Sequence, residues 1–226
     1  GPEFMFGHVV GDAIDAPVLL IKVAWGGKSL AVDFRPPSAG GEVGPCYTEL
    51  LERVADVRAT LDKRFPALAG REQRLCGFAW HQGWNDRVNQ SATDEYADNI
   101  ADFINDIRFD LDAANLPFVI ANTGIGGPGE TNTRALALMN AQLSVDELTG
   151  SNPMTNVRTI DTRQYWRDAS ISPITSGNQG FHWNQNGETK TIAGNDGGCI
   201  GAWSLLQLRF AQLWRNQQHS CVKVDR

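Results

Sequence analysis

Short apolar runs alternate with longer amphipathic stretches along this chain. The runs have the length of β-strands and end in polar or glycine-rich residues; they cover residues 18–25, 75–80, 117–122 and 157–160. The stretches between them carry apolar residues at helical spacing, over residues 47–65, 93–113 and 133–148. Because strands alternate with helices, the pattern predicts an α/β fold whose parallel sheet is covered by helices on both faces.

Two further helix boundaries can be predicted from the sequence. The segment from Ser91 to Asp94 resembles a helix cap, with acidic residues in the first turn that follows. A last helix is predicted to begin at Gly187 or Gly198 and to end at Trp214. The sequence shows no internal repeat, low-complexity tract or long linker.

Composition and charge narrow the classes of partner. The chain has 226 residues, of which 42% are hydrophobic, so we expect a single domain over residues 1–226. Its formal net charge of −6 predicts no broad basic surface, which disfavours nucleic acid as a partner. The longest apolar runs are too short to span a bilayer, so we expect no membrane partner. No signal peptide is recognisable, which leaves an extracytoplasmic and a cytoplasmic location both open.

The four cysteines do not suggest a metal site. Cys46, Cys76, Cys199 and Cys221 form no Cys-x-x-Cys pair, so we expect no zinc site, and we predict no metal and no cofactor. Cys76 lies in an apolar run and is predicted to be a core thiol. A disulfide between Cys199 and Cys221 stays open, because both flank one predicted helix.

Ligands of parallel α/β folds bind beyond the carboxyl ends of the strands, so the residues after each run carry the candidate chemistry. The first run ends in Trp25-Gly-Gly-Lys-Ser-Leu30, a turn whose backbone N–H groups could approach a ligand. The alternative is an ordinary glycine turn with an exposed lysine. The second run ends in Trp80-His-Gln-Gly-Trp-Asn-Asp86, a loop rich in donors and aromatic rings that suits a small polar ligand. The alternative is a hydrogen-bonded loop in which Asn85 and Asp86 cap the next helix.

The last three candidate loops are less specific. Residues 122–130 hold four glycines, which predicts a mobile loop at the rim of a site; the segment lacks the lysine of a phosphate-binding loop. Asp161 follows the fourth run and could orient a histidine or bind a helix terminus. His182 lies in a polar loop and could be a general base near its ordinary pKa of about 6.5, although a lone histidine is more often structural.

Tryptophan is frequent in these loops. Four of the seven tryptophans, Trp25, Trp80, Trp84 and Trp183, lie in or beside the motifs. Flat amphipathic rings stack well on sugar faces, and core packing is the ordinary alternative.

Taken together, the loops resemble the SGNH hydrolase superfamily, and most closely its carbohydrate-esterase branch of acetylxylan esterases and sialate O-acetylesterase-like proteins. Four stretches carry the resemblance: Gly1-Pro-Glu-Phe-Met-Phe-Gly7, Trp25-Gly-Gly-Lys-Ser29, Trp80-His-Gln-Gly-Trp-Asn-Asp86, and Asn178-Gln-Gly-Phe-His-Trp-Asn184 with Glu188-Thr189. They follow one another in the order of the family's blocks and span nearly the whole chain.

The resemblance implies a three-layer α/β/α sandwich of flavodoxin type and a serine esterase that acts without a cofactor. In such an esterase a serine attacks the ester carbonyl and a histidine takes its proton; carried over, His182 is this base. Oxyanion donors would be the backbone of Gly26 or Gly27 and the amide of Gln82 or Asn85. A cleft lined by Trp25, His81, Trp84 and Trp183 would accept the substrate, an acetylated carbohydrate or a small acyl ester.

The chain departs from the family at the nucleophile. The family holds its serine in a Gly-Gln-Ser-Asn or Gly-Asp-Ser block after the first strand, and no such block is present here, so the expected fold lacks that strand. Three explanations stay open. An N-terminal part could be missing from this sequence or be supplied by another copy, which would make a homodimer; Ser29 could be a relocated nucleophile rather than a turn hydroxyl; or the chain could be a non-catalytic sugar-binding relative.

The catalytic acid also departs from the pattern. The superfamily often has an aspartate three residues before the histidine, and Gln179 stands at that position here. A dyad could suffice, Asp161 or Glu188 could supply the carboxylate, or a backbone carbonyl could orient the imidazole. The sequence thus predicts a serine-type esterase that removes O-acetyl groups from sugars, with a carbohydrate-binding protein that lost its nucleophile as the alternative.

Overall fold

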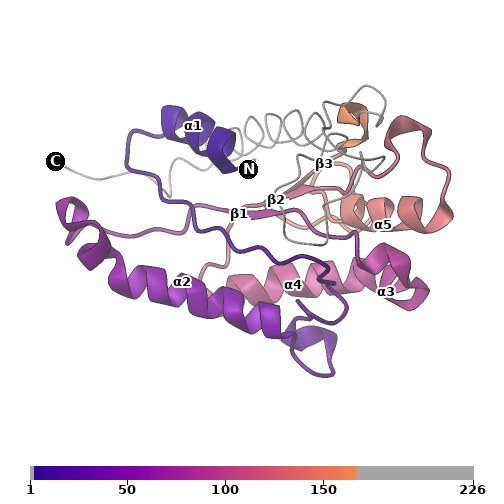
Figure 1. Cartoon of the computed structure of the whole chain (residues 1–226), viewed down its shortest axis with the longest axis horizontal. Coiled ribbons are helices and arrows are strands. Elements are labelled where there is room, and N and C mark those ends of the chain that lie inside the picture. Colours follow the sequence, from indigo (N-terminus) through magenta and orange to yellow (C-terminus); the bar gives the residue numbers. More distant parts are fainter. Residues whose placement is uncertain (1–2, 167–226) are drawn as a thin grey trace, which may run out of the picture.

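The computed structural model describes residues 3–166, which form a mixed α/β fold (Figure 1). The helices of the described part are α1 (Glu3–Ala13), α2 (Pro45–Arg64), α3 (Gln90–Asp94), α4 (Tyr96–Asp110) and α5 (Thr133–Ser144), and the strands are β1 (Phe78–Trp80), β2 (Phe118–Ala121) and β3 (Val157–Ile160). Short 3₁₀ turns follow several strands, among them one at Asp86–Val88. None of the described helices is long and apolar enough to cross a membrane.

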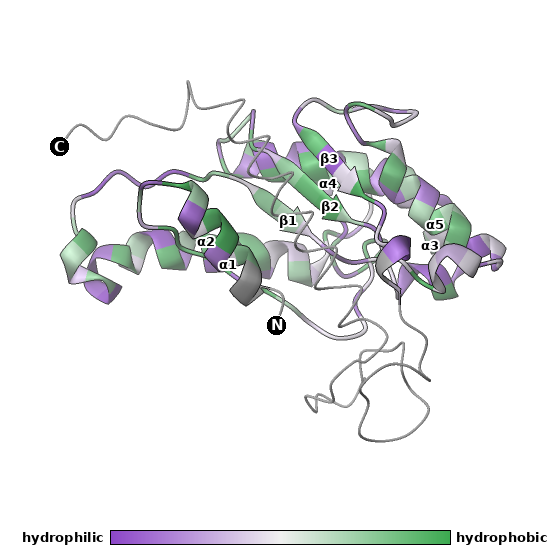
Figure 2. Ribbon diagram, turned by 90° about the horizontal axis from the view of Figure 1, so that it is seen from above, coloured by the Kyte–Doolittle hydropathy of each residue, from purple (hydrophilic) through white to green (hydrophobic). Residues whose placement is uncertain are grey.

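The three described strands form a parallel sheet in the order β1-β2-β3. Phe118 pairs with Phe78 on one side and with Val157 on the other. All four residues of β2 are buried, and Figure 2 shows this strand in the colours of hydrophobic residues. A central parallel strand is apolar on both faces because both faces are covered.

Helices cover the sheet on both faces, which confirms the predicted three-layer architecture. Phe118 and Ile120 of β2 belong to a core that also includes buried residues of α2, α4 and α5. Val119 and Ala121 point to the opposite face, because side chains alternate along a strand, and they pack with Phe6 of α1. Figure 1 shows α1 on one side of the sheet and α2 with α4 on the other.

Most of the predicted elements are confirmed with changes at their ends. Strand β3 has the predicted bounds, β2 lies within 117–122, and β1 covers only the second half of 75–80. Helices α2 and α5 lie where helical spacing predicted them. Helix α5 ends early because Asp146 accepts the backbone N–H groups of Leu148 and Thr149 at 3.0 Å each, which folds the chain into a turn.

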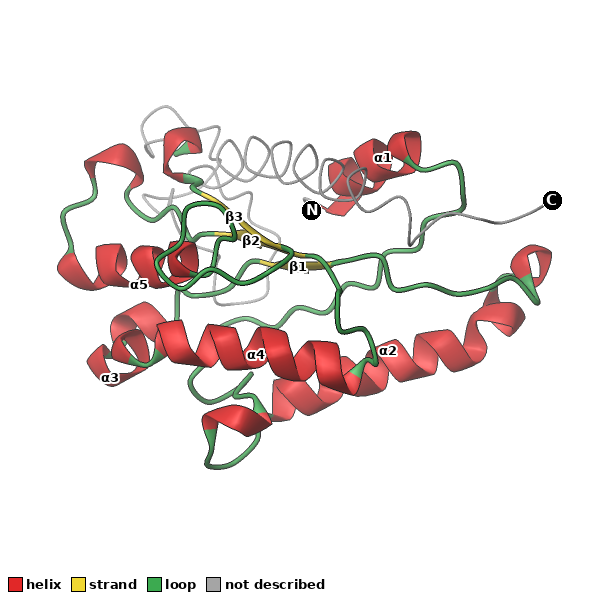
Figure 3. Ribbon diagram, turned by 180° about the vertical axis from the view of Figure 1, so that it is seen from behind, coloured by secondary structure: helices red, strands yellow, loops and turns green. Residues whose placement is uncertain are grey.

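The prediction of a strand at 18–25 was wrong. Figure 3 shows loop between α1 and α2, and the segment forms no ladder with a described strand. Ile21, Val23 and Trp25 are partly buried while Lys22 and Ala24 are exposed, so the segment has the alternation of a strand. A strand is defined by the partner it bonds to, and apolar alternation does not supply that partner.

The predicted helix over 93–113 is two helices. Helix α3 ends at Asp94 and α4 begins at Tyr96, with Glu95 between them. The cap also lies two residues before the predicted one: Asn89 accepts the backbone N–H groups of Ser91 at 2.9 Å and Ala92 at 3.3 Å. Asparagine is among the best N-cap residues because its side-chain oxygen accepts these otherwise unpaired donors.

The cysteine predictions have mixed outcomes. Cys76 is half-buried rather than a core thiol, because it precedes β1 in the part of the apolar run that joins no strand. Cys46 on α2 is buried in the core. Cys199, Cys221 and the predicted last helix lie outside the described residues.

Candidate functional site

The loops that leave the three strands are joined to one another at the carboxyl end of the sheet. After β1 and β2, Gln142 of α5 joins the two loops: its Nε2 donates to the carbonyl of Gln82 at 2.6 Å, and its Oε1 accepts the N–H of Thr123 at 3.0 Å. After β2 and β3, the Nδ2 of Asn122 donates to Asp161 at 3.1 Å. The candidate segments that follow β1, β2 and β3 therefore lie together, as the parallel arrangement predicted.

The turn after residue 25 is held by its own carboxylate. Gly27 has a φ of +68°, a left-handed conformation that glycine adopts without strain. Asp33 accepts the Nζ of Lys28 at 2.9 Å and the backbone N–H of Ser29 at 2.9 Å. Burial opposes ionisation of Asp33, but these two donors outweigh it and lower its pKa.

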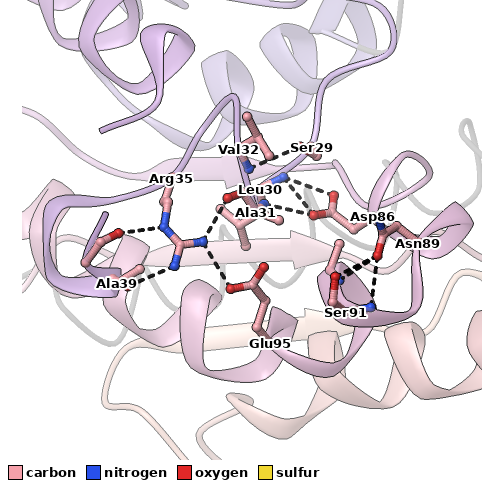
Figure 4. A network of polar contacts seen from close by, with 12 residues as sticks. Ser29, Leu30, Ala31, Val32, Arg35, Ala39, Asp86, Asn89, Ser91 and Glu95 are labelled. Atoms are coloured by element: carbon pink, nitrogen blue, oxygen red, sulfur yellow. Dashed lines mark hydrogen bonds and ion pairs between the residues drawn. The ribbon is translucent and has the colours of Figure 1, made fainter. Parts of the chain in front are cut away.

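Ser29 has the contacts of a turn residue. Its side chain is buried, and its hydroxyl donates to Asp33 at 3.2 Å. Its oxygen accepts the N–H of Val32 at 3.2 Å (Figure 4). These contacts match the turn role that the sequence left open. Its role as nucleophile stays a prediction.

Asp86 ties the loop after β1 to the same turn. Its carboxylate is fully buried, and it accepts the backbone N–H of Leu30 at 3.0 Å and that of Ala31 at 2.9 Å. The Nε2 of Gln82 donates to the other carboxylate oxygen at 2.5 Å. Burial raises the pKa of Asp86, and these N–H donors work against that shift because they favour the charged form.

The two amides predicted as oxyanion donors differ in their surroundings. The Nε2 of Gln82 donates to the carbonyl of Lys28 at 2.9 Å as well as to Asp86, and its Oε1 accepts the Tyr96 hydroxyl at 3.2 Å. Asn85 is half-buried, and within the described residues its side chain makes no hydrogen bond. The amide of Asn85 is therefore available to a ligand in this arrangement, whereas that of Gln82 is occupied.

The aromatic residues of the motifs divide into core and surface. Trp80 is buried between Phe34 and Phe103, with ring centroids at 5.2 and 4.5 Å, and it belongs to the core. Trp25 and Trp84 are half-buried; the Arg87 guanidinium lies 4.1 Å from the centroid of the Trp84 ring. A cation over an aromatic face is an attractive contact.

His81 follows β1 directly and keeps exposed surface. Desolvation by the protein lowers the pKa of its imidazole, which favours the neutral ring. A neutral imidazole can donate and accept hydrogen bonds, which fits the predicted contact with a polar substrate.

The glycine-rich loop after β2 is packed against the segment after β3. A Cβ on Gly124, which has a φ of +59°, would lie 2.2 Å from the Oγ1 of Thr162. A Cβ on Gly127 would lie 2.6 Å from the Cβ of Trp166. Neighbouring side chains thus occupy the space around this part of the segment, and its mobility stays a prediction.

Asp161 is engaged by an arginine. Its carboxylate forms an ion pair with Arg163, whose Nε lies 2.9 Å from Oδ1, and it accepts the Nδ2 of Asn122. Burial opposes ionisation, but these bonds lower the pKa of Asp161. Asp161 is thus a charged carboxylate at the strand ends, and its role as the catalytic acid stays a prediction. His182 and Trp183 lie outside the described residues.

Three buried polar residues of this region were missed or misassigned in the sequence. Asp86 was named as a helix cap only in the alternative interpretation of its loop, Tyr96 lies in a stretch whose helical spacing was interpreted as core, and Gln142 was not singled out. Tyr96 donates to the carbonyl of Gln82 at 3.0 Å and accepts from the indole Nε1 of Trp80 at 3.3 Å. No sequence signal distinguishes a buried polar residue with partners from a surface one.

Two of three comparisons with known proteins give a match. A family model described as carbohydrate esterase, sialic acid-specific acetylesterase, matches residues 1–174. The comparison with curated proteins gives no match. A protein of Arabidopsis thaliana, with an X-ray structure at 1.6 Å resolution, matches in fold with a TM-score of 0.58 and 19% identity, over 96% of this chain and 68% of that one. The chain belongs to the carbohydrate esterase family of sialic acid-specific acetylesterases.

Proposed function

We propose that this chain removes O-acetyl groups from sugars by a serine-type mechanism. The observation that carries the proposal is the family match, whose 174 residues include the glycine turn and the loop after β1. In the structure these two segments are bonded to each other through Asp86 and Gln82. The available amide of Asn85 therefore lies in a loop that is fixed to the Gly26–Gly27 turn.

The chemistry has two steps. A serine oxygen attacks the acetyl carbonyl while His182 takes the serine proton, and the sugar hydroxyl leaves with that proton. Water then attacks the acetyl-serine while the same histidine takes its proton; the bond from the carbonyl carbon to the serine oxygen breaks, the histidine returns the proton to the serine, and acetate is released. In both steps negative charge develops on the former carbonyl oxygen, where the Gly26 or Gly27 N–H and the Asn85 amide would donate. The identity of the serine is not assigned; Ser29 remains one candidate.

The surroundings of Trp84 favour an acidic sugar as substrate. The guanidinium of Arg87 lies over the Trp84 ring, and its Nε is buried without a hydrogen-bond partner in the described part of the chain. A buried donor without a partner is costly unless a ligand satisfies it. A carboxylate on the sugar would accept from this guanidinium. Glu130 lies near enough to Arg87 to offset part of its charge.

A carbohydrate-binding protein without catalysis is the second candidate. The observation that favours it is the engagement of the Ser29 hydroxyl with Asp33 and Val32, which leaves Ser29 a structural role. Such a protein would show quenching of tryptophan fluorescence by an oligosaccharide and no release of acetate.

Acetate release from O-acetylated sialic acid and from nitrophenyl acetate tests the proposal. We expect turnover by the wild-type chain and a loss of kcat of about 10³-fold or more in His182→Ala, because the base is removed. His8→Ala is the matched control, since His8 is an exposed histidine on α1. Turnover that is unchanged in His182→Ala, or absent from the wild type, would contradict the proposal.

A further inference from the structure

The two segments that carry the proposed oxyanion donors have no secondary structure in common. The turn at residues 26–31 belongs to the long connection between α1 and α2, and residues 81–85 follow β1. No strand ladder joins the connection to the described sheet. Side-chain contacts must therefore fix the distance between the Gly26–Gly27 backbone and the Asn85 amide.

The contacts that do so centre on one buried carboxylate (Figure 4). Asp86 accepts backbone N–H groups from Leu30 and Ala31, which lie 56 and 55 residues away in the sequence. Gln82 completes the connection, because its Nε2 donates both to Asp86 and to the carbonyl of Lys28. We call these five residues, Lys28, Leu30, Ala31, Gln82 and Asp86, the Asp86 clamp.

The ends of the clamp lie next to the proposed donors. Asp86 directly follows Asn85, and Lys28 directly follows Gly27. Backbone donors and a side-chain amide stabilise an oxyanion only when both reach it at about 2.7–3.1 Å. A displacement of about 1 Å between the two segments is enough to lower a rate by about 10²-fold.

We propose that Asp86 is a positioning residue of the esterase site, which holds the Gly26–Gly27 turn in register with the Asn85 amide. This inference rests on the proposed function. Asp86 does not touch substrate; it acts through the two segments that do. A carboxylate suits the task because it offers only acceptors, and every group that the clamp directs at it is an N–H donor.

Asp86→Asn is the direct test because it keeps the size and replaces one acceptor oxygen by a donor. The amide would face N–H donors, so the segments would separate. We expect kcat to fall by about 100-fold with KM within about three-fold, since the loss concerns the transition state. Asp86→Glu keeps the charge but moves it by one methylene, and it serves if Asp86→Asn does not fold.

Asp146 supplies the matched control. It is also a buried aspartate that accepts backbone N–H groups, those of Leu148 and Thr159 among them, but it joins the segment after α5 to β3 and bonds to neither the glycine turn nor the loop after β1. We expect Asp146→Asn to lose stability while its kcat per folded molecule stays at the wild-type value. Faster hydrogen exchange at the Leu30 and Ala31 amides is expected in Asp86→Asn and not in Asp146→Asn.

The outcomes separate the two proposals. A wild type without esterase activity would overturn the proposed function and this inference with it. An active wild type whose folded Asp86 variants keep the kcat of Asp146→Asn would overturn this inference alone. A selective fall of kcat, with faster exchange at Leu30 and Ala31, would support it.

Discussion

Two aspartates are buried in the described part of the chain; Asp86 follows β1 and Asp146 follows α5. Asp146, which lies beside β3, forms an ion pair with Arg158 at 3.0 Å, and its pKa is lowered although burial opposes ionisation. Asp86, beyond the end of β1, is held by N–H groups, and burial raises its pKa. The charge of Asp146 is compensated by a cation, whereas in the described structure the charge of Asp86 is met by dipoles.

This difference indicates different roles for the two aspartates. A buried carboxylate with a raised pKa does not contribute stability through its ionisation, because the folded state favours the neutral form. Asp146 joins the end of α5 to β3 and stabilises the fold. Asp86 joins two segments of the candidate site, and such unfavourable groups are kept most often where function needs them.

Removing the Asp146 carboxylate should give the largest loss of stability. Asp146→Ala leaves the Arg158 guanidinium and several N–H groups without their acceptor, so we expect the free energy of unfolding to fall by about 3–5 kcal/mol. Asp86→Ala leaves only neutral N–H donors without an acceptor, so we expect its free energy of unfolding to fall by about 1–3 kcal/mol. Urea denaturation of both variants checks this order, and a larger loss for Asp86→Ala would reverse our assignment of roles.

Two glycines, Gly150 near Asp146 and Gly83 near Asp86, should separate effects on stability from effects on activity. A Cβ on Gly150 would lie 2.1 Å from the Ser144 carbonyl oxygen, and a Cβ on Gly83 would lie 2.7 Å from the Nε2 of Gln142. Alanine at either position should lower the free energy of unfolding by about 1–3 kcal/mol. The loss should be at least as large for Gly150→Ala, because the atom that its Cβ would meet belongs to the backbone and cannot move aside as a side chain can. We expect kcat/KM per folded molecule to fall in Gly83→Ala only; equal effects on activity would contradict the separation.

The two aspartates should give opposite pH dependences of stability. The pKa of Asp146 is lower in the folded state than its ordinary value of 3.8. Its contribution to the free energy of unfolding is therefore complete above about pH 3.8 and is lost as the pH falls through the folded pKa. Asp86 has a raised pKa in the folded state, so the folded state takes up a proton at a higher pH than the unfolded state does. Its contribution to the free energy of unfolding therefore increases as the pH falls through this raised pKa. The free energy of unfolding of Asp146→Asn should therefore approach that of the wild type as the pH is lowered from 7 to 3. The same sign of change in Asp86→Asn would contradict the two pKa directions.

The smallest effect is expected at the edge of the candidate site. Arg87→Ala should raise KM for an O-acetylated acidic sugar by about 10-fold, equivalent to about 1.4 kcal/mol, and leave KM for nitrophenyl acetate unchanged. Arg53→Ala is the control, because Arg53 is an exposed arginine on α2 paired with Glu49. An equal rise of KM for both substrates would argue against recognition of a carboxylate by Arg87.

The sequence predicted best the helices and strands whose contacts are either close in the sequence or apolar. The strand at 157–160 and helix α2 follow from periodicity alone, and both are confirmed. The segment 18–25 shows the limit, because its alternation is present but its ladder partner is not. The contact of Asp86 with Leu30 spans 56 residues, and no local pattern encodes such a pair. The site was thus predictable as a set of loops, and its polar connections were not.

The central claim is that the chain is a serine-type esterase, and a fluorophosphonate probe tests it most directly. An activated serine attacks the phosphorus and displaces fluoride, which adds one phosphonyl group to the chain. Intact mass and peptide mapping of the purified chain should show one such group on one serine, and none in His182→Ala. No adduct on a chain whose mass matches its sequence would contradict the claim and favour the carbohydrate-binding alternative.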